Sequence, residues 1–200
     1  MGRQIMHCTR PLAAAALLMA AIVFAGQAAL ACGYHDPRSM ARGLMNLVFP
    51  KSLYVSTAVW RAQRSGVLPP RQRKAAKDLF AYQRDVSNLQ KLGARLVAPS
   101  REEGSFALVL LDSMLWTRFV SGPDGYTVAT HVKGPEKGDA VLVTESAVIK
   151  ALLDGSIDMP AVEAKGLFRL YGPVERQAAT RNALRGLSTK SPAASLEKAG

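Results

Sequence analysis

The spacing of hydrophobic residues changes along the chain, from a helical period before residue 100 to a strand-like period after it. Short helices are expected at residues 38–48 and 52–63. The strongest helical pattern covers residues 70–97, where apolar positions recur at alternating spacings of three and four and form one stripe. These positions are Leu79, Tyr82, Val86, Leu89, Gly93 and Leu96. Because glycine lacks a side chain, another element is expected to approach closely at Gly93.

Beyond residue 105, apolar and polar residues follow the two-residue period of β-strands. Strands are predicted at residues 105–111, 114–120, 126–132, 140–144 and 167–171. Pro123 and Gly125 mark a tight turn between the second and third strands. Further helices are expected at residues 146–153 and 173–187. Short turns favour antiparallel pairing, so we predict an α+β fold: an antiparallel sheet of about five strands covered by helices, with an added helical N-terminal half.

The first 31 residues have the features of an export signal rather than of a folded domain. Arg3 and Arg10 give a basic start, and residues 12–25 are apolar throughout. Ala29 and Ala31 provide the small-residue pattern that precedes a cleavage site. The apolar run falls short of the roughly 18 residues that a membrane-spanning helix needs. We therefore expect an exported, periplasmic protein, with a retained membrane anchor as the alternative.

Cysteine placement restricts the mature protein. Cleavage after Ala31 would remove Cys8 and make Cys32 the first residue, so an internal disulfide is excluded. A lipid anchor on acylated Cys32 is an alternative, although Ala29 stands where lipoprotein signals usually carry a bulky aliphatic residue. Cys32, His35 and the α-amine would also offer ligands for copper or zinc, since thiolate and imidazole suit these metals. An unstructured tail is the other interpretation of this segment.

Positive charge points to an anionic partner. The chain carries a formal net charge of +11, or about +9 without Arg3 and Arg10. The export signal argues against nucleic acid, and the densest basic cluster has no interleaved aromatic residues on which bases could stack. Its members are Arg61, Arg64, Arg71, Arg73, Lys74 and Lys77. An anionic membrane surface, an acidic cell-wall polymer or an acidic exported protein is the expected partner, and a solvated helix face is the alternative interpretation.

Residues that could carry catalysis do not form a recognisable arrangement. Without the leader, the histidines are His35 and His131. The sequence has no GxSxG motif, no glycine-rich phosphate loop and no HExxH motif. Five aspartates stand at predicted turns and helix boundaries, where aspartate is common: Asp112, Asp124, Asp139, Asp154 and Asp158. We therefore predict a non-enzymatic protein without a cofactor.

Residues 139–172 combine a strand, a helix, a glycine turn, a second short helix and another strand. The positions that define this order are Asp139, residues 146–153, Gly155, residues 161–164, Gly166 and Gly172. Together with the strands before it, this block resembles the lipid-binding domain of the sterol carrier protein family, over about residues 105–172. The resemblance implies a five-stranded sheet covered by helices, an apolar tunnel between them and no catalytic residues. Residues 32–100 are expected to pack with residues 101–187 as one domain, followed by a flexible tail at residues 188–200.

The apolar residues of this region define a candidate ligand site. It comprises Phe106, Leu108, Trp116, Val128, Val148, Leu152 and Phe168. A mostly apolar cavity is the usual site for a small hydrophobic ligand, but the same residue types would equally fill a core. We therefore predict an exported binding protein for a lipid-like or other hydrophobic molecule. The alternatives are an accessory protein that binds another exported protein, and a metal-handling protein that uses its mature N-terminus.

Overall fold

The computed structural model describes residues 37–70, 79–97 and 104–189. The predicted signal, Cys32 and His35, most of the predicted tail, and the basic residues Arg71, Arg73, Lys74 and Lys77 lie outside the described residues. The chain divides into two compact units, Met1–Met40 and Ala41–Gly200. The first unit contributes only the start of one helix to the described part, so the fold belongs to the second unit.

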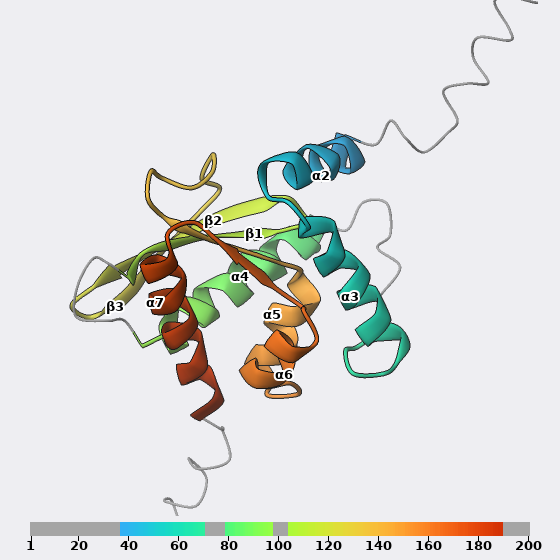
Figure 1. Ribbon diagram of the computed structural model, residues 1–200. Helices are drawn as coiled ribbons and strands as arrows, with labels where there is room; N and C mark the ends of the chain where they lie inside the picture. Colours follow the sequence, from blue (N-terminus) through green and yellow to red (C-terminus); the bar gives the residue numbers. More distant parts are fainter. Residues whose placement is uncertain (1–36, 71–78, 98–103, 190–200) are drawn as a thin grey trace, which may run out of the picture. The chain divides into compact units, whose positions relative to one another are not determined.

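Three helices come first in the described chain: α2 (Pro37–Val48), α3 (Ser52–Arg64) and α4 (Leu79–Arg95) (Figure 1). The first two match the helices predicted at residues 38–48 and 52–63, and α4 occupies the described end of the predicted helix at residues 70–97. Each has a buried side because apolar residues three and four positions apart fall on one face. Val55 and Val59 bury α3, and Leu89 and Leu92 bury α4.

Five strands form one sheet in the order β3-β2-β1-β4-β5. The strands are β1 (Phe106–Leu110), β2 (Leu115–Gly122), β3 (Gly125–Thr130), β4 (Ala140–Thr144) and β5 (Arg169–Tyr171). The hairpin of β2 and β3 closes at the predicted turn, where Gly122 lies opposite Gly125. The prediction of an α+β fold with about five strands is confirmed.

One strand pair runs parallel, which corrects the prediction of a wholly antiparallel sheet. Strands β1 and β4 run in the same direction, with Phe106 opposite Ala140, whereas the other three pairs are antiparallel. The prediction assumed that each short connection returns the chain beside the preceding strand. Residues 131–139 instead carry the chain from β3, at one edge, past β2 and β1. Asp139 ends this crossing, and its carboxylate accepts a hydrogen bond of 3.0 Å from Nε of Arg118.

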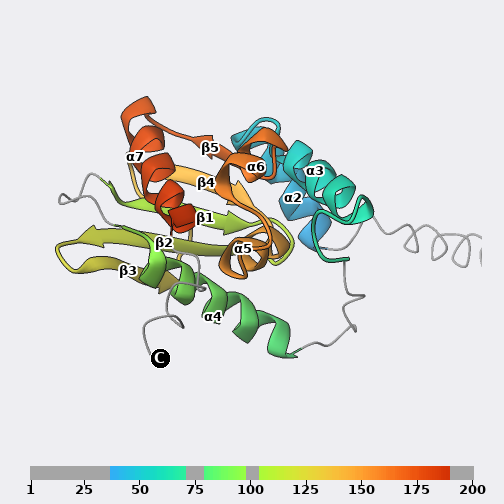
Figure 2. The same ribbon diagram turned by 90° about the horizontal axis from the view of Figure 1, so that it is seen from below.

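Helices α4, α5 (Ser146–Leu153), α6 (Met159–Ala164) and α7 (Val174–Arg185) lie on one side of the sheet, as Figures 1 and 2 show together. The last described element is the 3₁₀ helix η4 (Gly186–Thr189). Strand β2 shows which side chains face the helices, because its burial alternates. Leu115, Thr117 and Phe119 are buried, whereas Trp116 and Arg118 are partly exposed on the opposite face.

Aromatic residues join the turn between α2 and α3 to that opposite face. The ring of Phe49 lies 6.0 Å from Trp116 of β2 and 5.2 Å from Tyr171 of β5, between ring centres. The hydroxyl of Tyr171 donates to the carbonyl oxygen of Pro50 at 2.8 Å. These contacts fix the start of α3 against the sheet.

Among the described helices, none is both long and apolar enough to cross a membrane.

The helix-covered face of the sheet is closely packed. Phe106 and Phe119 stack with their ring centres 4.7 Å apart. A β-carbon at position 93 of α4 would lie 2.2 Å from Cγ2 of Val128, so the predicted close approach at Gly93 is confirmed. A β-carbon at Gly172 would lie 2.7 Å from the backbone oxygen of Asp139. Both glycines therefore allow contacts that any side chain would block.

Candidate functional site

Six of the seven predicted ligand residues lie on the helix-covered side of the sheet, but the structure does not bring them to one place. Val148 and Leu152 of α5 lie with Phe168 around one small cavity. Phe106 stacks on Phe119, and Val128 packs against α4 at Gly93. Leu108 is fully buried in the central strand. The predicted set is therefore divided between separate parts of the core.

Trp116 lies on the other face of the sheet and does not share a site with the rest. It pairs with Val109, whereas Leu108 pairs with Thr117. Successive side chains of a strand point to opposite faces, so Trp116 and Leu108 cannot face the same cavity. Trp116 instead contacts Phe49.

The cavity beside Phe168 is small. It measures about 10 Å³ and is lined by Leu142, Val148, Leu152 and Leu184, among others. That volume is about the space that one water molecule needs, whereas sites for small molecules enclose roughly 300–1,000 Å³. The interior is therefore packed at this point, and ligand binding by the seven predicted residues stays a prediction.

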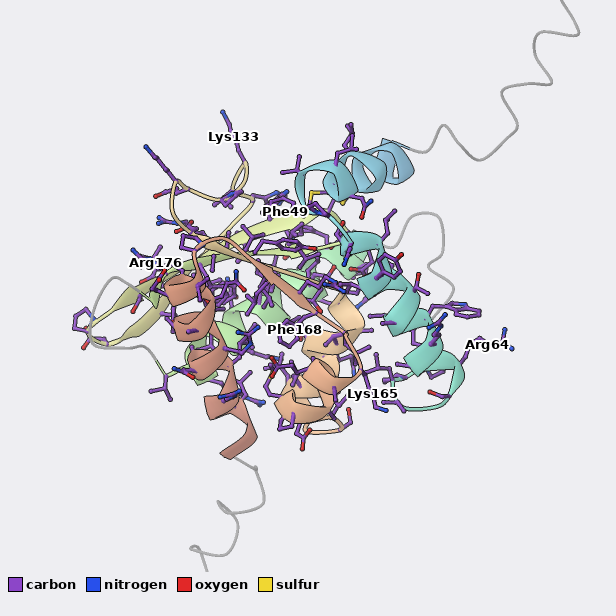
Figure 3. All side chains as sticks on the ribbon, in the orientation of Figure 1. Phe49, Arg64, Lys133, Lys165, Phe168 and Arg176 are labelled. Carbon is purple, nitrogen blue, oxygen red and sulfur yellow. The ribbon has the colours of Figure 1, made fainter. Side chains whose placement is uncertain are left out.

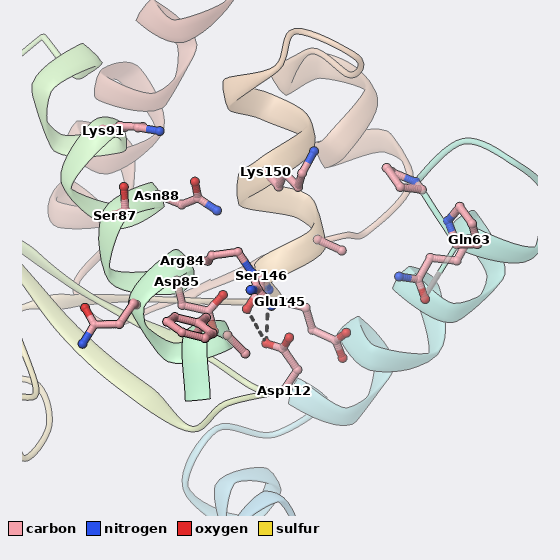
Figure 4. A pocket seen from close by; sticks show the side chains of 16 residues that line it. Gln63, Arg84, Asp85, Ser87, Asn88, Lys91, Asp112, Glu145, Ser146 and Lys150 are labelled. Atoms are coloured by element: carbon pink, nitrogen blue, oxygen red, sulfur yellow. Dashed lines mark hydrogen bonds between the residues drawn. The ribbon is translucent and has the colours of Figure 1, made fainter. Parts of the chain in front are cut away.

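A larger cleft of about 740 Å³ opens beside α4 and α5 (Figure 4). Its walls come from α4, from the start of α5, from the end of α3 with the loop after it, and from the turn between β1 and β2. The lining residues include Phe80, Arg84, Asp85, Asn88 and Lys91 on α4, Glu145, Ser146, Ala147 and Lys150 at α5, Pro69 and Pro70 in the loop, and Asp112 in the turn.

Asp112 connects the turn between β1 and β2 to α5. The backbone N–H and the hydroxyl of Ser146 both donate to Oδ1 of Asp112, at 3.1 and 3.0 Å. Ser146 is the first residue of α5, and a carboxylate stabilises a helix N-terminus by satisfying its free N–H groups and complementing its partial positive charge. Asp112 therefore fixes the position of α5 at the cleft.

Charged groups are unevenly placed in the cleft. Figure 4 shows the side chains of Asn88 and Lys91 pointing from α4 toward α5, while Asp85, Asp112 and Glu145 lie with Arg84 at the other end. Lys150 forms an ion pair of 2.5 Å with Asp154 on the exposed side of α5. Phe80 adds apolar surface because its side chain is 72% exposed. The cleft therefore combines apolar surface with hydrogen-bond donors at one end.

Sequence reasoning missed this cleft because its wall is the polar side of α4. Phe80, Arg84, Asn88 and Lys91 recur at spacings of four, four and three, and so form a second stripe beside the buried one. A stripe of this composition is usually a solvated helix face. The signal that could have indicated the cleft is Phe80, a large aromatic residue in an otherwise polar stripe.

The structure describes neither of the predicted metal ligands and only part of the predicted basic cluster. In residues 37–70, 79–97 and 104–189, no group of three His, Cys, Asp or Glu side chains is placed to hold a metal ion. Cys32 and His35 lie outside these ranges, so copper or zinc binding there stays a prediction. The two described members of the basic cluster, Arg61 and Arg64, are exposed on α3.

Comparison with known proteins yields likenesses to parts of solved structures. No family model and no curated protein matches this chain. UbiJ-SCP2, a ubiquinone synthesis protein, is 13% identical with a TM-score of 0.34, over 56% of this chain and 93% of that one. TT1886 of Thermus thermophilus, titled a conserved hypothetical protein and candidate sterol carrier protein, is 16% identical with a TM-score of 0.34, over 58% and 89%.

A third likeness is to the sec-alkylsulfatase Pisa1 from Pseudomonas sp., with 14% identity and a TM-score of 0.35 over 46% of this chain. The chain spans 15% of the length of that enzyme. The name of TT1886 includes that of the family which the sequence resembles. Because all three TM-scores lie below 0.5, function is argued from the residues of this chain.

Proposed function

We propose that this protein binds an amphiphilic, lipid-like molecule in the cleft between α4 and α5. The observation that carries the proposal is the cleft itself, since about 740 Å³ lies within the roughly 300–1,000 Å³ of small-molecule sites. Its walls supply both kinds of contact that an amphiphile needs. Phe80 and Pro69 offer apolar surface, and Asn88 and Lys91 offer hydrogen-bond donors.

Charge decides where the head of such a ligand binds. At one end of the cleft the carboxylates of Asp85, Asp112 and Glu145 outnumber Arg84, whereas Lys91 at the other end would attract an anionic group (Figure 4). Phe80 lies about 16 Å from Lys91 along the helix axis, at 1.5 Å per residue. An anionic head at Lys91 therefore leaves the length of α4 for a tail, which would pass Arg84 and reach the apolar surface of Phe80 and Pro69.

We also propose that the protein is a binding protein rather than an enzyme, and that it acts after export. The hydroxyl of Ser146 is committed to Asp112, where it stabilises the start of α5. Export is supported by the basic start, the apolar run and the small residues before Cys32 in the sequence.

The test is a titration of the purified protein with dansyl-undecanoic acid, a fluorescent single-chain anionic amphiphile, alongside native mass spectrometry of protein from its own host. We expect Lys91→Ala to weaken probe binding about tenfold or more, because a hydrogen bond to a charged group contributes about 1.5–3 kcal/mol. Lys133→Ala is the matched control, since Lys133 lies in the exposed loop at residues 131–139. Circular dichroism checks that each variant is folded.

Equal probe affinity for Lys91→Ala and wild type would contradict the cleft as the site. Leu152→Trp separates this cleft from the core, because Leu152 borders the 10 Å³ cavity beside Phe168 and does not line the cleft. Loss of probe binding in Leu152→Trp alone would place the ligand between the helices and the sheet.

A further inference from the structure

Six large apolar side chains are exposed on the consecutive helices α2 and α3. They are Leu44, Leu47, Val48, Leu53, Tyr54 and Trp60 (the α2–α3 surface). Leu47 is 77% exposed and Tyr54 is 67% exposed. Figure 1 shows the two helices joined directly by a short turn. Several exposed apolar side chains on two consecutive helices are typical of a surface that contacts another molecule.

Helix α2 turns three of the apolar side chains that the structure describes outward. Met45 is buried against the core, whereas Leu44, Leu47 and Val48 are exposed. Their spacing of three and four places these three residues on one face. An amphipathic helix in a water-soluble domain normally buries such a face, so this arrangement needs an apolar environment outside the fold.

Helix α3 carries apolar residues on both of its sides. Val55 and Val59 are buried, and Leu53 and Trp60, seven residues apart, are exposed along one line of the helix. Arg64 continues this line, and its guanidinium lies 5.1 Å from the ring centre of Trp60. Aromatic, aliphatic and basic groups therefore share the exposed side of α3.

Along the sequence, the charge of the segment that carries this surface has a single sign. From Pro37 to Lys77 the sequence contains nine Arg and Lys residues and no Asp or Glu. Within the described part, Lys51, Arg61 and Arg64 are exposed at α3. A second copy of the chain docked on the same face would bring like charges together, which is unfavourable. The charge instead complements an anionic surface.

We propose that the α2–α3 surface docks this protein on an anionic lipid bilayer. Tryptophan and tyrosine favour the boundary between headgroups and acyl chains, and helices with apolar and basic groups lie in that plane. The exposed side of a helix is convex, so its side chains can enter the headgroup region without a complementary pocket. This docking is independent of the proposed ligand site, because none of the six residues lines the cleft.

The experiment measures binding of the mature protein to vesicles by the fluorescence of Trp60. Trp116→Phe leaves Trp60 as the single tryptophan of the chain. Vesicles of phosphatidylcholine with phosphatidylglycerol should shift its emission to shorter wavelength, and brominated acyl chains should quench it. Vesicles of phosphatidylcholine alone should bind much more weakly, and added salt should weaken binding to the anionic vesicles.

Matched variants test whether vesicle binding depends on the α2–α3 surface or only on the overall apolar character and charge of the protein. Leu47→Ser should lower the partition coefficient roughly five- to tenfold, because the lost apolar contact scales with buried area. Val174→Ser is its control, since Val174 is 74% exposed on α7. Arg61→Gln with Arg64→Gln should also weaken binding, whereas Lys133→Gln with Arg176→Gln should not; Figure 3 shows Lys133 and Arg176 away from α3.

Three results would overturn the proposal. One is unchanged Trp60 emission with anionic vesicles. Another is an equal loss of binding in Leu47→Ser and Val174→Ser. The third is a dimer in light scattering that Leu47→Ser dissociates, in place of vesicle binding, which would assign the surface to a second copy of the chain. Failure of the amphiphile titration would leave this result unaffected, so the two proposals can fail separately.

Discussion

Gly93 of α4 and Val128 of β3 lie so close that a β-carbon at position 93 would stand 2.2 Å from Cγ2 of Val128. Phe119 of β2 lies 3.5 Å from the same point and limits movement on that side. Carbon atoms in favourable contact are about 3.5–4.0 Å apart. Valine is stiff at its first side-chain dihedral, so it cannot easily turn away. The absence of a side chain at position 93 therefore sets how closely α4 approaches the sheet.

We expect Gly93→Ala to destabilise the protein, although alanine is the better helix former. Alanine in place of glycine favours a helix by about 1 kcal/mol, whereas overpacking a core costs about 1–3 kcal/mol. The measurement is the free energy of unfolding in urea. The double variant Gly93→Ala with Val128→Ala should be more stable than the sum of the two single effects predicts. Strictly additive effects would contradict the contact.

Elements with strong local periodicity could be predicted closely from the sequence. Strand β4 and helix α5 have the predicted limits, and α3 extends the predicted helix by one residue. Gly93 could be predicted because it interrupts an apolar stripe. The parallel pairing of β1 with β4 could not, since it depends on a crossing held by Arg118 and Asp139, which are 21 residues apart.

The candidate site was harder to predict than the fold. Trp116 and Leu108 are both large apolar residues in predicted strands. Only the register of the strands shows that they face opposite sides of the sheet. The cleft depends on how the polar side of α4 meets the start of α5, where Asp112 binds Ser146 from another element. Periodicity within one segment contains no information about such contacts.

The buried carboxylate of Asp139 should contribute more to stability than an exposed one. Its side chain is 7% exposed, and it accepts hydrogen bonds from Nε and Nη2 of Arg118 and from the backbone N–H of Glu136. The hydrogen bond to Asp139 is the main cause that raises the pKa of Arg118. We expect Asp139→Asn to lower the free energy of unfolding by about 2 kcal/mol, because hydrogen bonds to charged groups contribute about 1.5–3 kcal/mol.

The control for Asp139→Asn is the same substitution at Asp154. Asp154 pairs with Lys150 one turn away, and both side chains are more than half exposed. Such pairs contribute about 0.3–0.5 kcal/mol. Equal losses of stability in the two variants, measured by urea unfolding, would show that the residue 131–139 crossing is not held by Asp139.

Gly172 should be intolerant of any side chain. Its φ of 103° is a conformation that other residues rarely adopt, and an added β-carbon would meet the backbone oxygen of Asp139 at 2.7 Å and Cα of Ala140 at 3.2 Å. We expect Gly172→Ala to lower the unfolding free energy by about 2–4 kcal/mol, from backbone strain and overpacking combined. Gly43→Ala is the control, because a β-carbon there meets nothing within 4 Å in helix α2. Gly43→Ala should leave stability unchanged or raise it, so an equally harmless Gly172→Ala would contradict the close approach of β4 and β5.

Tyr126 should make stability depend on pH in the alkaline range. Burial raises the pKa of Tyr126 to about 12, and its hydroxyl donates to the carbonyl oxygen of Gly104 at 3.0 Å. In an unfolded chain the pKa of tyrosine is about 10. The folded state therefore holds this proton more tightly, so the contribution of Tyr126 is complete below about pH 10 and is lost as the pH rises toward 12.

Absorbance of the ionised phenol, compared between wild type and Tyr126→Phe, measures this ionisation directly. The difference between the two proteins should titrate near pH 12 when folded and near pH 10 in urea, because unfolding removes the burial. The unfolding free energy of wild type should also fall relative to Tyr126→Phe between those two values. A difference that titrates near pH 10 in the folded protein would mean that Tyr126 is accessible to water, and that the contacts of its ring with Phe106 and Phe119 do not exclude solvent from the phenol.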